Sequence, residues 1–241
     1  MTAPIDTAAA RYGFRKMVKH SQAEINSLAT TLAAEFPSLP LESLARYIGD
    51  IVEWNDRIGL VSKRSTLLSL ERLVRQSGQL YEFLQQQHVL SETGGESVVD
   101  IGTGAGFQGL VWKLMQPTLA VTLVERRQKK ATFLQRTTVV LGLKGVEVVE
   151  GDAAEVATYE WLSQHFDVAT SFAVAVPDAI ARLVEPFVKP RGHYCTLRPR
   201  EEITLTDRIG RTLALAATAE YENGRFCLYR RKEDSDPDST H

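Results

Sequence analysis

The residues best suited to chemistry in this sequence surround a glycine-dense turn. A short β-branched run carries Asp100 near its end and leads into Gly102, Gly104 and Gly106. Glycine lets the backbone turn sharply and approach a ligand that any Cβ would obstruct. A second strand-like run ends at Glu125, whose carboxylate can accept hydrogen bonds from both hydroxyls of a ribose. Together these features predict a pocket for a nucleoside-containing cofactor.

The glycines fit two registers, and the choice decides the chemistry. Gly104, Gly106 and Gly109 match the dinucleotide-binding spacing GxGxxG, which an acid about 20 residues further on completes. The other register, Asp-x-Gly-x-Gly-x-Gly, begins at Asp100 and is the first motif of class I S-adenosylmethionine (SAM) methyltransferases. Its carboxylate can meet the cationic amino-acid end of the cofactor directly or through water. Because a dinucleotide fold does not ask for this acid, the sequence favours a methyltransferase over a dehydrogenase.

Composition and charge bound the remaining possibilities. With 241 residues and 44% hydrophobic content, the chain can bury one core and a small second lobe. It shows no apolar run of membrane length and no signal-peptide pattern, so we expect a cytoplasmic protein without membrane contact. Cys195 and Cys227 lack metal-ligand spacing, so we expect buried thiols and no metal site. Because the net charge is −2, contacts with nucleic acid require local basic patches. We expect a monomer.

Four zones follow one another along the chain. Residues 1–20 form a basic arm with little to pack, which we expect to be flexible. Residues 21–90 show apolar side chains at helical spacing and are predicted to form a helical N-terminal lobe. Residues 91–232 begin with a linker, continue with alternating strand and helix patterns, and are predicted to form the SAM-binding domain. Residues 233–241 are an acidic tail that we expect to be disordered.

The alternating zone also predicts a topology. Strands are expected at 98–101, 120–124, 146–149, 166–171 and 193–197, with helices at 107–115, 128–141 and 177–188, the last closed by the run at 189–192. A short helix follows Leu197, and then two strand-like runs at 213–221 and 226–231 flank Asn223-Gly224, a hairpin signal. Five parallel strands plus a C-terminal antiparallel hairpin are the class I methyltransferase topology. The predicted fold class is therefore α/β and Rossmann-like, with a small helical N-terminal lobe.

Several motifs, in order and without large gaps over residues 40–200, are similar to those of one known family. They are Tyr47-Ile48, Trp54-Asn55, the turn at 99–109, and the runs at 121–125, 129–134, 141–149 and 166–171. These residues resemble the ribosomal small-subunit methyltransferase G family, also called glucose-inhibited division protein B. The resemblance implies transfer of a methyl group from SAM to ring nitrogen 7 of a guanine in small-subunit ribosomal RNA. It also implies RNA or the small ribosomal subunit as the partner.

The resemblance further implies roles around the cofactor. Glu125 would bind the ribose, Asp152 would accept a hydrogen bond from the adenine amino group, and Phe107 would line the pocket. Asp152 also fits a simple turn residue, and Phe107 a helix residue packed on the sheet. The complete predicted cofactor-binding set is Asp100, Gly102, Gly104, Gly106, Phe107, Glu125, Asp152, Ala153, Ala154 and Phe172.

The sequence departs from the family where the substrate would bind. The family's Ser-Arg-Ala after the fourth strand reads Ser171-Phe172-Ala173, and its His-x-x-Asp-Ser block reads Leu73-Val74-Arg75-Gln76-Ser77. We expect Phe172 and Arg198 to position the substrate, Phe172 by stacking on a base or, equally, by sheet packing alone. Arg198 replaces a lysine and offers a planar fork of donors. No general base is assigned, because ring nitrogen 7 has no proton to lose. The clustered departures predict a diverged member.

Other cations could contact RNA. The candidates are Arg72, Arg75 and Arg200, although for the first two we expect a solvated helix face instead. The basic run at 126–130 starts a predicted helix, where cations oppose the macrodipole, so either an RNA-facing role or a solvated helix start fits it.

Three functions from different classes follow from these observations. The first is an active SAM methyltransferase that acts on RNA. The second is a SAM-binding interaction or regulatory protein with little turnover. The third is a nicotinamide-dependent oxidoreductase, which only the dinucleotide register supports.

Overall fold

The computed structural model describes residues 20–62, 66–172, 177–199, 208–222 and 224–233. The predicted basic arm, except His20, and the predicted acidic tail, except Glu233, lie outside these ranges. So does the segment at 200–207, where the short helix after Leu197 was expected.

Three helices form the N-terminal part of the structure, as the helical spacing predicts. They are α1 (Gln22–Glu35), α2 (Leu41–Ile58) and α3 (Thr66–Gln86). A capping box at Ser21 starts α1, because the serine hydroxyl and the acid three residues later satisfy free backbone N–H groups. Gly59, with φ of 64°, ends α2 in the left-handed conformation that glycine adopts at little cost.

The described strands form one sheet in the order β3-β2-β1-β4-β5-β8-β7-β6. They are β1 (Ser97–Ile101), β2 (Ala120–Glu125), β3 (Val146–Glu150), β4 (Phe166–Thr170), β5 (Val188–Pro199), β6 (Arg208–Ile209), β7 (Leu213–Tyr221) and β8 (Gly224–Arg231). The helices between them are α4 (Phe107–Met115), α5 (Gln128–Val140), α6 (Ala153–Val156) and α7 (Pro177–Val184). The first five strands are parallel and β8 is antiparallel to both β5 and β7. The predicted topology, five parallel strands and a hairpin, is confirmed.

The structure differs from the sequence-based expectation at the fifth strand. The strand begins at Val188 instead of His193, and the preceding helix already ends at Val184. The run at 189–192 was predicted to close that helix, but it belongs to the strand. Val188 pairs with Phe166, and the register then shifts before pairing resumes at His193. This irregular stretch contains a proline and a glycine, which are typical of turns. The sequence pattern therefore did not reveal the first part of the strand. The sequence also does not predict α6 and β6, which are too short to show a periodicity.

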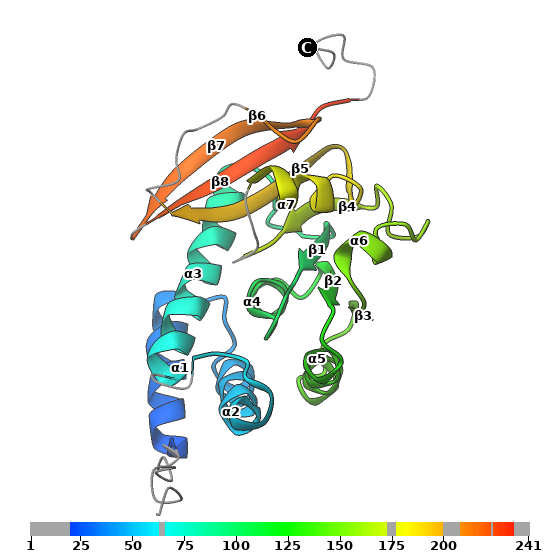
Figure 1. Cartoon of the computed structure of the whole chain (residues 1–241). Coiled ribbons are helices and arrows are strands. Elements are labelled where there is room, and N and C mark those ends of the chain that lie inside the picture. Colours follow the sequence, from blue (N-terminus) through cyan, green and yellow to red (C-terminus); the bar gives the residue numbers. More distant parts are fainter. Residues whose placement is uncertain (1–19, 63–65, 173–176, 200–207, 223, 234–241) are drawn as a thin grey trace, which may run out of the picture.

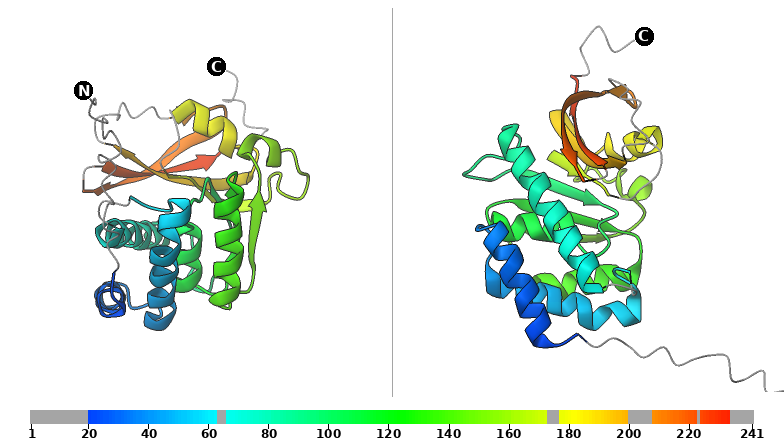
Figure 2. Two further views of the ribbon diagram at one scale, coloured as in Figure 1. Left: turned by 60° about the horizontal axis from the view of Figure 1, so that its bottom comes forward. Right: turned by 90° about the vertical axis from the view of Figure 1, so that its left-hand side faces the viewer.

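Helices cover the sheet unequally. Figure 2 shows α1 to α5 gathered on one side of the sheet and α7 on the other. Alternate residues of β1 follow this division: Val98 packs into the core with the five helices, and Val99 into the core with α7. Figure 1 shows α3 running alongside α4 and up to the C-terminal strands. Asp100 near the end of β1 and Glu125 at the end of β2 meet the turn that leads into α4.

The three N-terminal helices pack on the sheet through a shared core. Leu44, Val74 and Leu84 from these helices belong to the same buried cluster as Trp112 of α4 and Val98 of β1. The indole nitrogen of Trp112 donates a 2.9 Å hydrogen bond to the carbonyl of Ser77.

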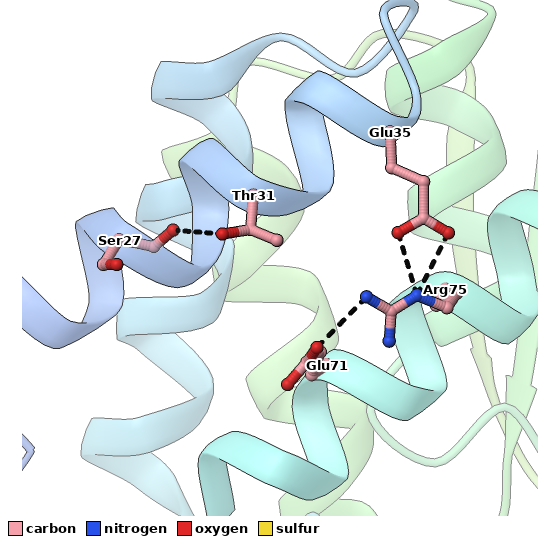
Figure 3. Close-up of polar contacts among 5 residues, drawn as sticks. All are labelled: Ser27, Thr31, Glu35, Glu71 and Arg75. Carbon is pink, nitrogen blue, oxygen red and sulfur yellow. Dashed lines mark hydrogen bonds and ion pairs between the residues drawn. The ribbon is translucent and has the colours of Figure 1, made fainter.

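An ion-pair network joins α1 to α3. Arg75 Nε lies 2.8 Å from one carboxylate oxygen of Glu35, and a second guanidinium nitrogen of Arg75 lies 3.0 Å from Glu71. Figure 3 shows this guanidinium held between the two carboxylates, while the hydrogen bond from the Thr31 hydroxyl to Ser27 lies further along α1. These carboxylates raise the pKa of Arg75, with the bond to Glu35 as the largest cause. Arg75 therefore joins two helices, so the solvated-face expectation is wrong for it.

Two helical glycines give a matched stability test. A Cβ on Gly78 of α3 would lie 2.7 Å from the buried ring of Phe36, whereas a Cβ on Gly49 of α2 would meet nothing within 4 Å. We expect Gly49→Ala to raise the free energy of unfolding by about 0.5–1 kcal/mol, the usual helix-propensity gain. We expect Gly78→Ala to lower it by about 1–3 kcal/mol, because overpacking outweighs propensity. Urea denaturation of both variants measures the difference, and equal stabilisation of the two would contradict the packing.

Candidate cofactor and substrate site

The glycine turn has an unusual backbone conformation. Gly102, Gly104 and Gly106 have φ values of 68°, 63° and 91°, a region that side chains with a Cβ rarely adopt. The amides of Gly102 and Thr103 both donate to the carbonyl of Val124, at 2.9 and 3.1 Å, so the turn is attached to the end of β2. The three glycines are therefore required by the backbone itself.

Asp100 lies beneath this turn and is completely buried. Its Oδ2 accepts hydrogen bonds from the Thr103 hydroxyl at 2.6 Å and from the Gly109 amide at 3.2 Å. Its Oδ1 is buried and has no hydrogen-bond partner in the structure. The pKa of Asp100 is raised to about 6, with burial as the largest cause and nearby Glu125 as a smaller one, while the two hydrogen bonds oppose the shift. One oxygen of this acid is therefore left to pair with a group that the described residues do not supply.

Glu125 lies at the end of β2 and is held by the backbone. Its Oε2 accepts a 3.0 Å hydrogen bond from the amide of Gly104, and its Oε1 accepts a 2.8 Å bond from the amide of Arg127. A carboxylate has about four lone-pair sites, so each oxygen keeps capacity for one more donor. The two amides fix the orientation of the carboxylate, and this suits a pair of neighbouring hydroxyls.

The space around the glycines shows where a ligand fits. A Cβ on Gly104 would meet only the Gly102 carbonyl at 3.9 Å and Lys130 Nζ at 4.0 Å, so this side of the turn is open. A Cβ on Gly106 would lie 2.7 Å from Leu110, and one on Gly109 would lie 2.3 Å from Leu123. Gly106 and Gly109 thus allow α4 to pack closely, whereas Gly104 leaves room for a ligand.

The start of α4 adds donors to the turn. Its N-cap Gly106 offers no side-chain cap, so the first amides of the helix need other partners. Within the part of the chain that the structure describes, the backbone amides of Phe107 and Gln108 donate to no backbone carbonyl or side chain. Free amides at a helix N-terminus attract negative charge. An acceptor for an ammonium (Asp100) and donors for a carboxylate therefore flank the same turn, which suits the zwitterionic end of SAM.

Two side chains of the helical part bind this turn from behind. The Tyr47 hydroxyl of α2 donates a 2.9 Å hydrogen bond to the Ala105 carbonyl, and the Ser77 hydroxyl of α3 donates a 2.8 Å bond to the Phe107 carbonyl. The rings of Tyr47 and Phe107 also meet edge to face at 6.1 Å. Burial and the charge of Asp100 raise the pKa of Tyr47. Sequence reasoning missed both hydroxyls, since only contacts between distant segments reveal them.

The turn after β3 lies beside Glu125. The amide of Gly151 donates to the Glu125 carbonyl at 3.1 Å. Asp152 caps α6 and accepts a 3.0 Å hydrogen bond from the amide of Ala154, and its side chain is exposed. Ala153 is half-buried. Residues 152–154 thus lie just beyond the backbone contact between Gly151 and Glu125, the predicted ribose-binding residue. The role of Asp152 toward the adenine stays a prediction.

Phe172 and Arg198, the predicted substrate residues, lie on opposite faces of the sheet. Phe172 follows β4 and packs, half-buried, against the core shared with the N-terminal helices. Arg198 is buried on β5, and its guanidinium lies 3.3 Å from the hydroxyl of Tyr229, a residue of the other core. Thr170, two residues before Phe172, pairs with Asp100 across β1 and β4. Phe172 therefore lies near the cofactor turn.

The remaining cations have different environments. Arg126, Arg127 and Lys129 are exposed, while Lys130 is half-buried near Gly104. Burial lowers the pKa of Lys130, and Glu125 opposes that shift. The candidate Arg200 lies outside the described residues.

Groups of metal ligands and membrane-spanning helices are both absent from the described residues. They contain no group of three or more His, Cys, Asp or Glu side chains arranged to hold a metal ion. None of their helices combines the length and apolar character that crossing a bilayer requires.

Comparison with known proteins identifies one family. The family described as GidB, rRNA small subunit methyltransferase G, matches residues 40–217. The ribosomal RNA small subunit methyltransferase G of Caldanaerobacter subterraneus subsp. tengcongensis is 32% identical over 176 residues, which cover 72% of this chain and 70% of that protein. The protein of the same name from Clostridium botulinum strain Eklund 17B is 29% identical over 190 residues, covering 77% and 76% of the two chains.

Solved structures agree on the fold. A putative methyltransferase, yhhF from Escherichia coli, superposes with a TM-score of 0.53 at 15% identity, over 68% of this chain and 88% of that one. MtNAS, solved in complex with MTA and tNA, superposes with a TM-score of 0.53 at 16% identity, over 88% of this chain and 76% of that one.

The sheet order and the acid beneath the glycine turn decide between the two registers of the motif. The sheet ends in an antiparallel hairpin beyond five parallel strands, and Asp100 has the buried place that the methyltransferase register requires. The chain therefore belongs to the rRNA small subunit methyltransferase G family and is a SAM-dependent methyltransferase.

Proposed function

We propose that this enzyme methylates small-subunit ribosomal RNA at ring nitrogen 7 of a guanine, with SAM bound at the glycine turn. The observation that carries the cofactor's place is the buried Oδ1 of Asp100, which has no partner in the structure. Family membership supports the RNA substrate, since the relatives are named for small-subunit rRNA. A ribosomal substrate also supports a cytoplasmic location.

The residues of the turn fit each part of SAM. Asp100 suits the ammonium of the methionine end, and the amides at the start of α4 suit its carboxylate. Glu125 keeps acceptor capacity for the ribose hydroxyls. We propose that Phe107, Asp152, Ala153 and Ala154 would line the rest of the nucleoside.

The reaction needs positioning more than proton transfer. SAM supplies an electrophilic methyl group on a sulfonium when it is bound. Ring nitrogen 7 of guanine already carries a lone pair and no proton, so the enzyme has to hold it in line with that methyl group and exclude water. Orientation of this kind contributes most of the acceleration in reactions without a general base. The half-buried Phe172, at the end of the strand next to Asp100, is suited to excluding water and stacking on the base.

The resemblance implies that the substrate side of the site differs from that of the family. It places an arginine where this chain has Phe172, and phenylalanine offers no fork of charged donors. Arg198 retains a cation, but it is buried on the opposite face of the sheet beside Tyr229. We therefore propose that Arg198 acts on the substrate only by supporting the C-terminal strands, and that the enzyme recognises its guanine through different contacts.

The place of the cofactor predicts the effect of changing Glu125. We expect Glu125→Ala to weaken binding of SAM and S-adenosylhomocysteine by about 1.5–3 kcal/mol, the value of hydrogen bonds to a charged acceptor. Glu125→Gln keeps an acceptor for one donor and should lose less. Titration calorimetry measures the affinities, and circular dichroism verifies the fold. Wild-type affinity in Glu125→Ala would place the cofactor elsewhere.

The burial of Asp100 predicts a trade between stability and binding. Its pKa is about 6 in the folded chain and 3.8 as the ordinary value, so the folded state binds the proton more tightly. The free energy of unfolding should fall as pH rises from about 4 to about 6. Asp100→Asn avoids burying the charge, so we expect it to be more stable than wild type by about 1–2 kcal/mol at pH 8. This gain in stability should nearly vanish at pH 4. The variant should also fail to bind SAM.

Urea denaturation at both pH values and calorimetry with SAM check this prediction. A variant that is less stable at pH 8 and still binds SAM would contradict the proposed role of Asp100.

The loss of the arginine at position 172 predicts weak activity on the family's guanine. A missing hydrogen bond to a charged group costs about 1.5–3 kcal/mol, or roughly a factor of ten to more than a hundred in rate. In a bacterial strain that lacks its own methyltransferase G, we expect the wild-type chain to restore little methylation of that guanine, and Phe172→Arg to restore more. Mass spectrometry of 16S-type rRNA measures both. Full methylation by the wild-type chain would show that another residue supplies the contact.

A further inference from the structure

We infer that Tyr47 and Ser77 are positioning residues that hold the glycine turn in its cofactor-binding shape, an inference that rests on the proposed place of SAM at this turn. Both belong to the helical N-terminal part of the chain, on α2 and α3. Both side chains are completely buried, and each hydroxyl already donates to a backbone carbonyl of the turn. We therefore expect them to act on the cofactor through the backbone of the turn.

The turn needs external support because of its composition. Glycine loses more conformational freedom on folding than any other residue, and three of the five residues from 102 to 106 are glycine. The inner amides of the turn are held by Val124 and Glu125 of β2. The carbonyls of Ala105 and Phe107 instead point toward the helices and accept hydrogen bonds from Tyr47 and Ser77.

These carbonyls determine which way the adjacent amides face. A peptide group is planar, so fixing the Ala105 carbonyl also fixes the amide of Gly106, and fixing the Phe107 carbonyl fixes the amide of Gln108. The amide of Gln108 is one of the two at the start of α4 that donate to no described residue. Ser77 thus orients a backbone donor that is left for the ligand. Tyr47 orients the Gly106 amide, which donates to the Thr103 carbonyl at 2.9 Å and closes the turn.

Ser77 also connects the turn to the centre of α4. Its hydroxyl binds Phe107 while its carbonyl accepts the indole N–H of Trp112 at 2.9 Å. Ser77→Ala removes only the hydroxyl and leaves the Trp112 bond. Tyr47→Phe likewise removes one oxygen and keeps the ring that packs on Phe107.

Tyr81 supplies a matched control. Its buried hydroxyl donates a 3.0 Å hydrogen bond to the side chain of Gln116, at the far end of α4 from the turn. The same hydroxyl accepts a 3.0 Å hydrogen bond from the Gln85 side chain. Tyr81→Phe therefore costs at least as much buried hydrogen bonding as the other two variants without touching the glycine turn. A general loss of stability affects Tyr47→Phe, Ser77→Ala and Tyr81→Phe alike, whereas a loss of positioning affects the first two only.

The experiment compares these three variants, the double variant Tyr47→Phe/Ser77→Ala, and Glu125→Ala in the full chain. Titration calorimetry with S-adenosylhomocysteine gives the dissociation constant, and hydrogen exchange read by mass spectrometry follows the amides of residues 102–108. A hydrogen bond of about 1 kcal/mol corresponds to a factor of about five. We expect dissociation constants to rise about fivefold in Tyr47→Phe and in Ser77→Ala and about twentyfold or more in the double variant.

For Tyr81→Phe we expect a dissociation constant within about twofold of wild type, despite a similar fall in the melting temperature of the unliganded chain. Among the three single hydroxyl variants, exchange in 102–108 should accelerate in Tyr47→Phe and Ser77→Ala and stay unchanged in Tyr81→Phe. With RNA as acceptor, the KM for SAM should rise in these variants while kcat at saturating SAM changes little. If one of the two does not fold, the other carries the comparison.

Wild-type affinity in Tyr47→Phe and Ser77→Ala, with binding lost in Glu125→Ala, would overturn the inference and leave the place of the cofactor intact. Equal weakening in Tyr81→Phe would also overturn it, because the effect would then be one of stability. Unchanged affinity in Glu125→Ala as well would show that the cofactor does not occupy this turn.

Discussion

The buried carboxylate of Asp100 is the constraint around which the site is organised. A charge in a protein core is costly unless hydrogen bonds or an opposite charge compensate it. Thr103 and the amide of Gly109 satisfy one oxygen, and the second remains without a partner. The Gly109 amide can reach Asp100 only because Gly109 lacks a Cβ, which would lie 2.3 Å from Leu123. The acid thus dictates how closely α4 approaches the sheet, and its incomplete satisfaction is a local cost that a cationic ligand can relieve.

The arrangement of the glycine turn, Asp100 and Glu125 could be predicted because it depends on residues that are close in the sequence. The glycines, Asp100 and Glu125 sit at strand ends within 26 consecutive residues, from 100 to 125, and the parallel order of β1 and β2 brings them together. The bounds of α4 and β7 agree with the prediction at both ends, since each has a clear period and a glycine or a turn beside it. The fifth strand was misplaced because its irregular start contains Pro190 and Gly192, which imitate a turn.

The residues that prediction missed act across long separations. Tyr47 reaches a carbonyl 58 positions away and Ser77 one 30 positions away. Helical spacing places both on a buried face, but it does not say which backbone they meet. Arg75 and Arg198 illustrate the same limit for charges. A guanidinium in a sequence suggests phosphate, whereas in the fold Arg75 pairs with Glu35 and Glu71, and Arg198 is buried beside Tyr229.

The sequence pattern divides the chain near residue 90, but the physical core does not follow that division. Leu44, Val74 and Leu84 bury their side chains in one cluster with Trp112 and Val98. On this face of the sheet the N-terminal helices and the rest of the chain therefore share a single core. The two hydroxyl bonds to the glycine turn lie within the same buried layer. Removing the helices would therefore expose the apolar face of α4 and leave two carbonyls of the turn unpaired. In this fold the N-terminal helices support the glycine turn, because they complete the core on which the turn rests.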